Sequence, residues 1–243
     1  MQKNRSAIVI ASYNELEALP VLISKISPSL NQYQTIIIAD DSSIEIRKDL
    51  IARCNQEFKS STSKLDFSFA STKNGRGAAI YRGIKFAQET YGDFDNYIEC
   101  DSDGSHRAED IIRILNAEND VDLLIGSRYL PESKIIGWPI SRTVFSKILN
   151  LIIPKLLNVP CKDITNGLRR YSSRAVKILL ESTPKNSGFI YLSEQAQLIS
   201  KAKLTIAETP IIFENRIAGE STVGAKEILN SFIGVIKLII PRK

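Results

Sequence analysis

The chain has 243 residues, of which 43% are hydrophobic and 24% are charged, with only 12 glycines and 9 prolines. This composition excludes a disordered, collagen-like or low-complexity protein, and it predicts one large globular domain or one domain with a small appendage. The formal net charge of +5 favours anionic partners without choosing among nucleotides, lipid headgroups and nucleic acid.

Cysteine usage and the apolar runs bear on the compartment. Cys54, Cys100 and Cys161 form no CxxC pair and cannot all be bridged, so they indicate a reducing compartment and are expected to be small buried side chains. The N-terminus shows no secretion signal. The longest apolar runs, 148–157 and 228–240, fall short of the roughly 18 residues that a spanning helix needs. We therefore expect a soluble or surface-bound protein.

The first half of the chain alternates between two patterns. Short β-branched runs predict strands, and longer segments with helical spacing predict helices. The expected strands are 7–11, 35–39, 66–70, 96–100 and 122–126, and the expected helices are 15–27, 44–57, 78–91 and 108–118. This order predicts an α/β fold with a mostly parallel sheet between two layers of helices.

The second half is less regular. Its pattern predicts helices at 142–157, 173–182 and 190–202, a short segment at 167–171, a strand at 204–213 and an amphipathic segment at 225–240. Because neither a repeat nor a linker separates the halves, we expect them to share one fold.

Polar residues follow every strand expected in the first half. They are Ser12-Tyr13-Asn14-Glu15, Asp40-Asp41-Ser42-Ser43, Lys73-Asn74-Gly75-Arg76-Gly77, Asp101-Ser102-Asp103-Gly104-Ser105-His106 and Ser127-Arg128-Tyr129. In parallel sheets a ligand binds at the carboxyl ends of the strands. Any one segment can equally cap the next helix, but five at one edge favour a binding site.

Asp101-Ser102-Asp103 is the most informative of these segments. Two carboxylates separated by one small residue can offer oxygens to Mg²⁺ or Mn²⁺. Such an ion would bridge diphosphate oxygens and neutralise a nucleotide leaving group. The pattern is common by chance, but here it stands between a predicted strand and a predicted helix.

The other segments leave alternatives open. Of Asp40 and Asp41, one is expected to face the ligand and the other to cap helix 44–57, because neighbours on a strand point in opposite directions. Tyr13 offers a ring for base stacking. Glu15 either binds hydroxyls or simply lies in a first helical turn. The glycines around Arg76 indicate a phosphate-binding turn or close helix packing.

Taken in order, these segments resemble the signatures of family-2 glycosyltransferases with the GT-A fold. Three downstream segments narrow the resemblance to the dolichyl- or polyprenyl-phosphate mannose synthases: Trp138-Pro139-Ile140-Ser141-Arg142, Asp163 to Tyr171, and Gly188-Phe189 with Glu194. The match covers about residues 6–224. It implies a glycosyltransferase domain at 1–224, followed by an amphipathic helix, at 225–243, on a membrane surface.

The resemblance also implies roles for individual residues. Asp101, Asp103, Arg128 and Arg142 would be catalytic, and Asp101, Asp103 and Ser105 would hold Mg²⁺ or Mn²⁺. The sugar nucleotide would contact Ala11, Tyr13, Glu15, Ala39, Asp41, Ser102 and Arg216. The arginines would bind phosphates, because a guanidinium pairs two phosphate oxygens at once; the alternative for each is a surface ion pair.

Two positions depart from the family pattern, and a third matches it without an assigned role. Ala11-Ser12 stands where the family usually has Pro-Thr. Thr222 stands where it often has a lysine after Gly-x-Ser, unless Lys226 substitutes. His106 matches the pattern, and either a direct chemical role or a helix cap would explain it.

The implied reaction is a metal-dependent, inverting transfer of a hexose, with mannose from GDP-mannose preferred, to a polyprenyl or dolichyl phosphate. UDP-glucose or a UDP-N-acetylhexosamine remains an alternative donor, because no residue fixes the base or the sugar. A lipid monophosphate is already anionic and needs no strong general base. A nucleotidyltransferase and a non-catalytic binding module are the rival classes.

The same resemblance implies a peripheral protein on the cytoplasmic membrane face and no nucleic-acid partner. A small membrane partner subunit or a homo-oligomer is left open. The apolar faces of 142–157 and 225–240 would contact the membrane, cover the core or dock a partner.

Overall fold

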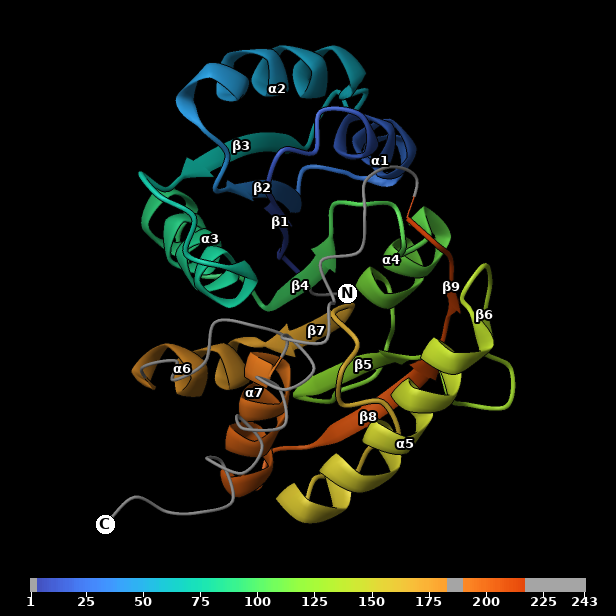
Figure 1. The fold of residues 1–243 in the computed structure, drawn as a ribbon. Coiled ribbons are helices and arrows are strands. Elements are labelled where there is room, and N and C mark those ends of the chain that lie inside the picture. Colours follow the sequence, from blue (N-terminus) through green and yellow to red (C-terminus); the bar gives the residue numbers. More distant parts are fainter. Residues whose placement is uncertain (1–3, 183–189, 217–243) are drawn as a thin grey trace.

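The computed structural model describes residues 4–182 and 190–216, which form a seven-stranded sheet flanked by helices (Figure 1). The strand order is β3-β2-β1-β4-β7-β5-β8. The strands are β1 (Ser6–Ser12), β2 (Gln34–Asp40), β3 (Lys64–Phe69), β4 (Asn96–Asp101), β5 (Leu123–Ser127), β7 (Arg169–Ser172) and β8 (Ile206–Pro210). A second, two-stranded sheet pairs β6 (Lys134–Ile135) with β9 (Ile212–Phe213).

Alternating side chains of the strands supply a separate core on each face of the sheet. Val9 belongs to a core shared with α3 (Arg76–Tyr91), α5 (Ile140–Leu157), α6 (Ser173–Glu181) and α7 (Ile190–Lys201). Its neighbours Ile8 and Ile10 belong to the opposite core. That second core contains the buried faces of α1 (Ala18–Ile26), α2 (Ile44–Glu57) and α4 (Ala108–Leu115); the turn η1 (Ser27–Ser29) follows α1.

The predicted α/β architecture is confirmed, including the mostly parallel sheet between helical layers. The short segment predicted at 167–171 is β7, which runs antiparallel to both β4 and β5 and so joins the first half of the sheet to the second. The two halves therefore share one fold, as expected.

Several predicted boundaries shift, and two of the differences have a local explanation. The strand expected at 204–213 is divided into β8, which pairs with β5, and β9, which pairs with β6. Pro210 lies at the division, and proline cannot donate to a strand ladder. The helix expected from residue 15 begins at Ala18, because Asn14 adopts a left-handed conformation with φ of 59°.

The cysteines have no disulfide partners; Cys54 and Cys100 are buried and Cys161 is half-buried. Burial raises the pKa of the Cys54 thiol to about 12, so it behaves as an apolar side chain. Within the described ranges, no helix is long and apolar enough to cross a membrane. The predicted segment 225–240 and the boundary at residue 224 lie outside the described residues.

Candidate active site

The register of the sheet brings the predicted segments to one edge. Ala11 of β1 lies beside Asp101 of β4, and Ser12 lies beside Asp40 of β2. Because β7 is antiparallel, its first residue, Arg169, also lies near this edge, opposite Glu99. The segments that follow β1, β2 and β4 therefore meet the loop that precedes β7.

Asp40 and Ser42 fix the loop that carries Tyr13 and Glu15. The Asn14 amide donates to Ser42 Oγ at 2.7 Å, and that hydroxyl donates to Asp40 Oδ2 at 2.8 Å. This relay holds the β1–α1 loop against the end of β2. Sequence analysis did not single out Ser42, because its partner is 28 residues away.

Neither Asp40 nor Asp41 caps α2, which corrects that expectation. The N-cap position is Ser43, while Asp40 accepts the bonds from Ser42. Asp41 is buried; its carboxylate accepts the Asn74 amide at 2.8 Å and pairs with Arg82 at 2.8 Å. Asp41 therefore ties α3 and its preceding loop to β2, and its contact with a nucleoside stays a prediction.

Tyr13 is exposed near the carboxyl-end edge of the sheet, whereas Ala39 is buried. The Tyr13 side chain is 43% exposed, and Lys73 Nζ lies 3.7 Å from its ring centroid. Ala11 is partly buried. Ala39 is fully buried in the core beside Gly83, and its contact with a sugar nucleotide stays a prediction.

Arg76 contacts the predicted metal-binding segment, although sequence analysis placed it only in a glycine turn. Its Nε donates to Asp101 Oδ1, its Nη1 pairs with Glu99, and its Nη2 donates to the Gly167 carbonyl at 3.1 Å. Burial opposes ionisation of Asp101, but Arg76 lowers the pKa of that carboxyl below its usual value. Arg76 therefore holds Asp101 both ionised and oriented.

The charges behind Asp101 are buried. Glu99 is 1% exposed; it accepts the Tyr171 hydroxyl at 3.0 Å and the Tyr191 hydroxyl. Burial raises the pKa of Glu99, and Arg76 opposes that shift. A Cβ at Gly77 would lie 2.8 Å from Tyr191 Cγ, so the glycine there serves close helix packing, which was one of the two alternatives.

His106 is buried and links two segments of the site through hydrogen bonds at both ring nitrogens. The Asp101 amide donates to His106 Nδ1 at 3.1 Å, and Nε2 lies 2.8 Å from Asn166 Oδ1. Since Nδ1 accepts a hydrogen bond, the hydrogen-bond network assigns the proton to Nε2 and a neutral ring. His106 therefore connects the segment Asp101–Asp103 to the loop before β7. The N-cap position of α4 is Arg107, so His106 is not the cap, and a direct chemical role for it stays a prediction.

Asp103 lies in front of Asp101. Its Oδ1 accepts the Ser105 amide at 3.0 Å, and its Oδ2 lies 3.4 Å from Arg216 Nη2. Ser102 and Ser105 are both buried. The structure thus brings Ser105 to Asp103 through its backbone, and its role as a metal ligand stays a prediction.

Glu15 completes a group of three carboxylates. Its pKa is raised, first by burial, then by the charge of Asp103 and, more weakly, of Asp101, while Arg216 opposes the shift. Carboxylates from the ends of two strands thus repel one another across the cleft. Such repulsion is relieved when a cation binds between them.

Asp101 and Asp103 fit a hard divalent cation. Asp101 Oδ2 lies 3.7 Å from His106 Nδ1, beyond hydrogen-bond distance, so this histidine does not occupy that oxygen. Over the described ranges no group of three or more acidic, histidine or cysteine side chains forms a complete metal cage. Mg²⁺ usually takes one or two carboxylates and completes its shell with water and phosphate oxygens, which matches this pair.

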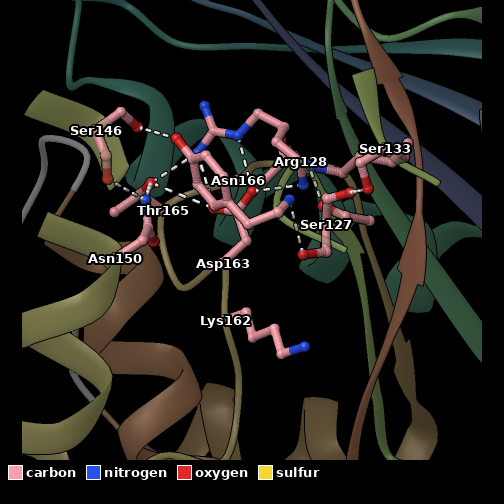
Figure 2. Close-up of polar contacts among 12 residues, drawn as sticks. Ser127, Arg128, Ser133, Ser146, Asn150, Lys162, Asp163, Thr165 and Asn166 are labelled. Atoms are coloured by element: carbon pink, nitrogen blue, oxygen red, sulfur yellow. Dashed lines mark hydrogen bonds and ion pairs between the residues drawn. The ribbon is translucent and has the colours of Figure 1, made fainter. Parts of the chain in front are cut away.

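Arg128 forms a buried bidentate ion pair with Asp163, which we call the buried fork (Figure 2). Its Nε donates to Asp163 Oδ2 at 2.8 Å, and its Nη2 donates to Asp163 Oδ1 at 2.8 Å and to Thr165 at 2.8 Å. Asp163 is in turn fixed by Glu208, which accepts its amide at 2.9 Å. The ion pair is buried at the cleft wall, unlike the surface pair considered from sequence.

Arg142 and Arg216 add positive charge in front of this fork. Arg142 Cζ lies 3.9 Å from the Trp138 ring centroid. The pKa of Arg142 is lowered, first by burial and then by the like charges of Arg216 and Arg128. The three arginines therefore lie close enough to repel one another, and an anion placed among them would relieve that repulsion; their phosphate-binding roles stay predictions.

Comparisons with known proteins agree with this geometry. The sequence pattern of glycosyl transferase family 2 matches residues 7–179. An undecaprenyl-phosphate mannosyltransferase of Micrococcus luteus is 28% identical over 96% of this chain and 93% of its own length. A polyprenol monophosphomannose synthase of Mycolicibacterium smegmatis is 28% identical over 95% of this chain and 85% of its own length.

Solved structures show the same fold at lower sequence identity. A glucosyl-3-phosphoglycerate synthase from Mycobacterium tuberculosis, in complex with Mn²⁺, UDP-glucose and glycerol 3-phosphate, has a TM-score of 0.64 and 16% identity, covering 99% of this chain and 82% of the other. A mannosyl-3-phosphoglycerate synthase from Rubrobacter xylanophilus has a TM-score of 0.63 and 14% identity, covering 97% and 73%.

Proposed function

Because the chain belongs to glycosyl transferase family 2, we propose that it transfers mannose from GDP-mannose to a polyprenyl phosphate, with inversion at the anomeric carbon. The observation that carries this proposal is the meeting of three carboxylates with three arginines at one edge of a GT-A sheet. One group suits a metal-bound diphosphate, and the other suits a second phosphate. Two relatives named for this chemistry, which align with nearly the whole chain, support the acceptor and the sugar.

The residues of the chain would act by holding charge in place. Asp101 and Asp103 would hold Mg²⁺ or Mn²⁺, which supplies neutralisation of the charge that develops on the departing nucleoside diphosphate. Arg76 keeps Asp101 ionised and aimed, and the Ser105 amide orients Asp103. A glucosyl-3-phosphoglycerate synthase with the same fold holds Mn²⁺ together with UDP-glucose, which supports the choice of metal.

Arg142 and Arg216 would receive the acceptor phosphate. Arg128 forms the fixed wall behind them, because Asp163 and Thr165 occupy Nε and Nη2. A phosphate monoester carries close to two negative charges near neutral pH, so its oxygen can attack without a strong base. Catalysis then depends on positioning and on electrostatic stabilisation.

A transfer assay tests the proposal directly. Radiolabelled GDP-mannose, UDP-glucose and UDP-N-acetylglucosamine are each incubated with polyprenyl phosphate and Mg²⁺ or Mn²⁺, and label in the lipid fraction is counted. We expect mannose alone to be transferred, as a product with inverted anomeric configuration. Transfer from a UDP donor instead would refute the donor, and no labelled lipid with any donor would refute the transferase function.

Asp103→Asn should lower kcat by at least about 100-fold, because the variant loses a carboxylate that would hold the metal ion, and with it the neutralisation of the departing diphosphate. Its circular dichroism spectrum should stay that of the wild type. The matched control is Asp49→Asn on the exposed surface of α2, which should keep full activity. An Asp103→Asn variant as active as this control would remove the metal assignment.

Arg142→Gln separates the acceptor from the donor. We expect KM for polyprenyl phosphate to rise about 10-fold or more, since a charge-assisted pair is lost, while KM for the sugar nucleotide stays nearly constant. Arg53→Gln, on exposed α2, is the control for removal of one positive charge. A change confined to the nucleotide KM would place Arg142 on the donor side instead.

A further inference from the structure

The outer face of α5 exposes an unusual concentration of apolar side chains. Ten large hydrophobic residues are exposed among the described residues, and six of them belong to this one helix. They are Ile140, Val144, Ile148, Leu151, Ile152 and Leu156. Their spacing of three or four residues makes a continuous stripe along one side of the helix, which we call the α5 stripe.

The α5 stripe faces away from the protein. The opposite side of the helix buries Asn150, Ile153, Pro154 and Leu157, and Figure 1 shows α5 along the outer edge of the molecule, far from α2. Other residues of α5 therefore make its contacts with the core, and the stripe is not needed for them. A contiguous exposed apolar stripe in a folded protein marks an interaction surface.

The charge around the α5 stripe identifies its partner. Between Glu132 and Asp163 the sequence contains no acidic residue, but it contains the five cations Lys134, Arg142, Lys147, Lys155 and Lys162. Lys147, Lys155 and Lys162 line an open groove of about 920 Å³ that Leu151 also borders. Within residues 4–182 and 190–216, no ion pair neutralises these three lysines.

Figure 2 shows that Lys162 points away from the cluster around Arg128 and Asp163. Lys162 is therefore not part of the buried ion pair between Arg128 and Asp163, although Arg128 also lines the groove that the three lysines share. A helix with an apolar stripe, flanked by lysines and free of acids, has the chemistry that binds at an anionic bilayer surface.

We propose that the α5 stripe, with Lys147, Lys155 and Lys162, docks this protein on a bilayer that contains anionic lipids. The stripe would enter the boundary between headgroups and acyl chains, and the lysines would contact phosphate headgroups. Arg142 lies in the first turns of the same helix and at the cleft, so docking would bring the cleft to the lipid surface. This inference deepens the proposed function, on which its catalytic benefit rests.

Vesicle binding of the full chain tests the proposal. The protein is mixed with phosphatidylglycerol–phosphatidylcholine vesicles or with phosphatidylcholine vesicles alone, and the bound fraction is measured by flotation. We expect preferential binding to the anionic vesicles, weakened by salt. The variant Ile148→Ser/Leu151→Ser/Ile152→Ser should bind at least 10-fold more weakly, and Lys147→Glu/Lys155→Glu should lose most of the preference for anionic vesicles.

Matched controls come from α2, where Ile44 is 74% exposed and Lys48 is exposed. Ile44→Ser and Lys48→Glu should bind vesicles as the wild type does. Wild-type protein that stays unbound, or α5 variants that bind as tightly as these controls, would overturn the proposal. Circular dichroism of each variant checks the fold, which exposed substitutions should leave unchanged.

An environment-sensitive fluorophore at Leu151→Cys, in a Cys161→Ser background, shows what covers the stripe. Its emission should shift to the blue only when anionic vesicles are added, and the same label at Ile44→Cys should not respond. Blue-shifted emission before vesicles are added would mean that the protein itself, or a second copy, covers the stripe. Light scattering that gives a dimer for the wild type and a monomer for the triple variant would also overturn the proposal.

Activity measured with a short-chain, water-soluble polyprenyl phosphate keeps the two proposals distinguishable. The variant Ile148→Ser/Leu151→Ser/Ile152→Ser should retain wild-type turnover on this acceptor, because these side chains are exposed on the outer side of α5. Loss of vesicle binding with intact turnover supports the docking surface. Wild-type protein that binds vesicles without any transfer refutes the proposed function alone.

Discussion

At the scale of single residues, the site depends on ionic partners that are far apart in the sequence. Arg76 links Glu99, Asp101 and the carbonyl of Gly167, so one guanidinium joins α3, β4 and the loop before β7. A Cβ at Gly167 would lie 2.4 Å from Arg76 Nη2. The glycine therefore leaves room for the guanidinium, and the guanidinium aims Asp101.

Removal of Arg76 should destabilise the protein through the charges it leaves behind. Arg76→Leu leaves Glu99 buried without its cation, and we expect a loss of about 3 kcal/mol in the free energy of unfolding, as for other broken buried pairs. Urea denaturation measures this loss. Arg76→Leu/Glu99→Gln should recover part of the stability, and a double variant no better than the single one would contradict the mechanism.

At the scale of elements, the buried carboxylate of Asp122, just before β5, connects three strands of the sheet. Asp122 accepts the Thr205 amide and hydroxyl, both at 3.0 Å, and the Ser172 hydroxyl at 2.7 Å. It thereby joins the start of β5 to the residue before β8 and to the end of β7. Burial opposes its ionisation, but these bonds and Arg174 lower its pKa from the ordinary value of 3.8.

The lowered pKa predicts a pH-dependent contribution of Asp122 to stability. An acid whose pKa is lower in the folded state stabilises the fold above its unfolded value, and this stability is lost as the pH falls through the folded value. Asp122→Asn should therefore cost about 2 kcal/mol at pH 7. The difference from the wild type should shrink below pH 3.8 in urea titrations, and a constant difference at every pH would contradict this reasoning.

At the scale of the whole molecule, β7 makes the two halves one cooperative unit. It pairs with β4 on one side and with β5 on the other, so the carboxylates from the first half and the arginines from the second share one rigid edge. Separation of the halves would expose the buried Arg169 and Tyr171. We infer that neither half is stable without the other.

Coincident unfolding curves check that inference. Trp138 is the single tryptophan and lies in the second half beside Arg142, so its fluorescence reports that half, while far-UV circular dichroism reports the whole chain. We expect both signals to give one thermal midpoint. Two separated midpoints would show that the halves unfold independently.

The sequence by itself determined the alternation of strands and helices and the segments that meet at the sheet edge. Both follow from local patterns, namely hydrophobic periodicity and the residues that follow each strand. The resemblance to family-2 glycosyltransferases, and not these local patterns, assigned Asp101, Asp103, Arg142 and Arg216 to one site. The structure places their charges close together, and their roles stay predictions.

The tertiary structure alone decided the partners and the exposed surfaces. Arg76 pairs with Asp101 across 25 positions, and Arg128 pairs with Asp163 across 35. Which side of α5 stays uncovered depends on what packs against it, and β7 runs antiparallel because of its neighbours β4 and β5. Local patterns fix which residues share a face of a helix or strand. The partner of a charged side chain, and the side of a helix that is covered, are decided only when segments distant in the sequence pack together.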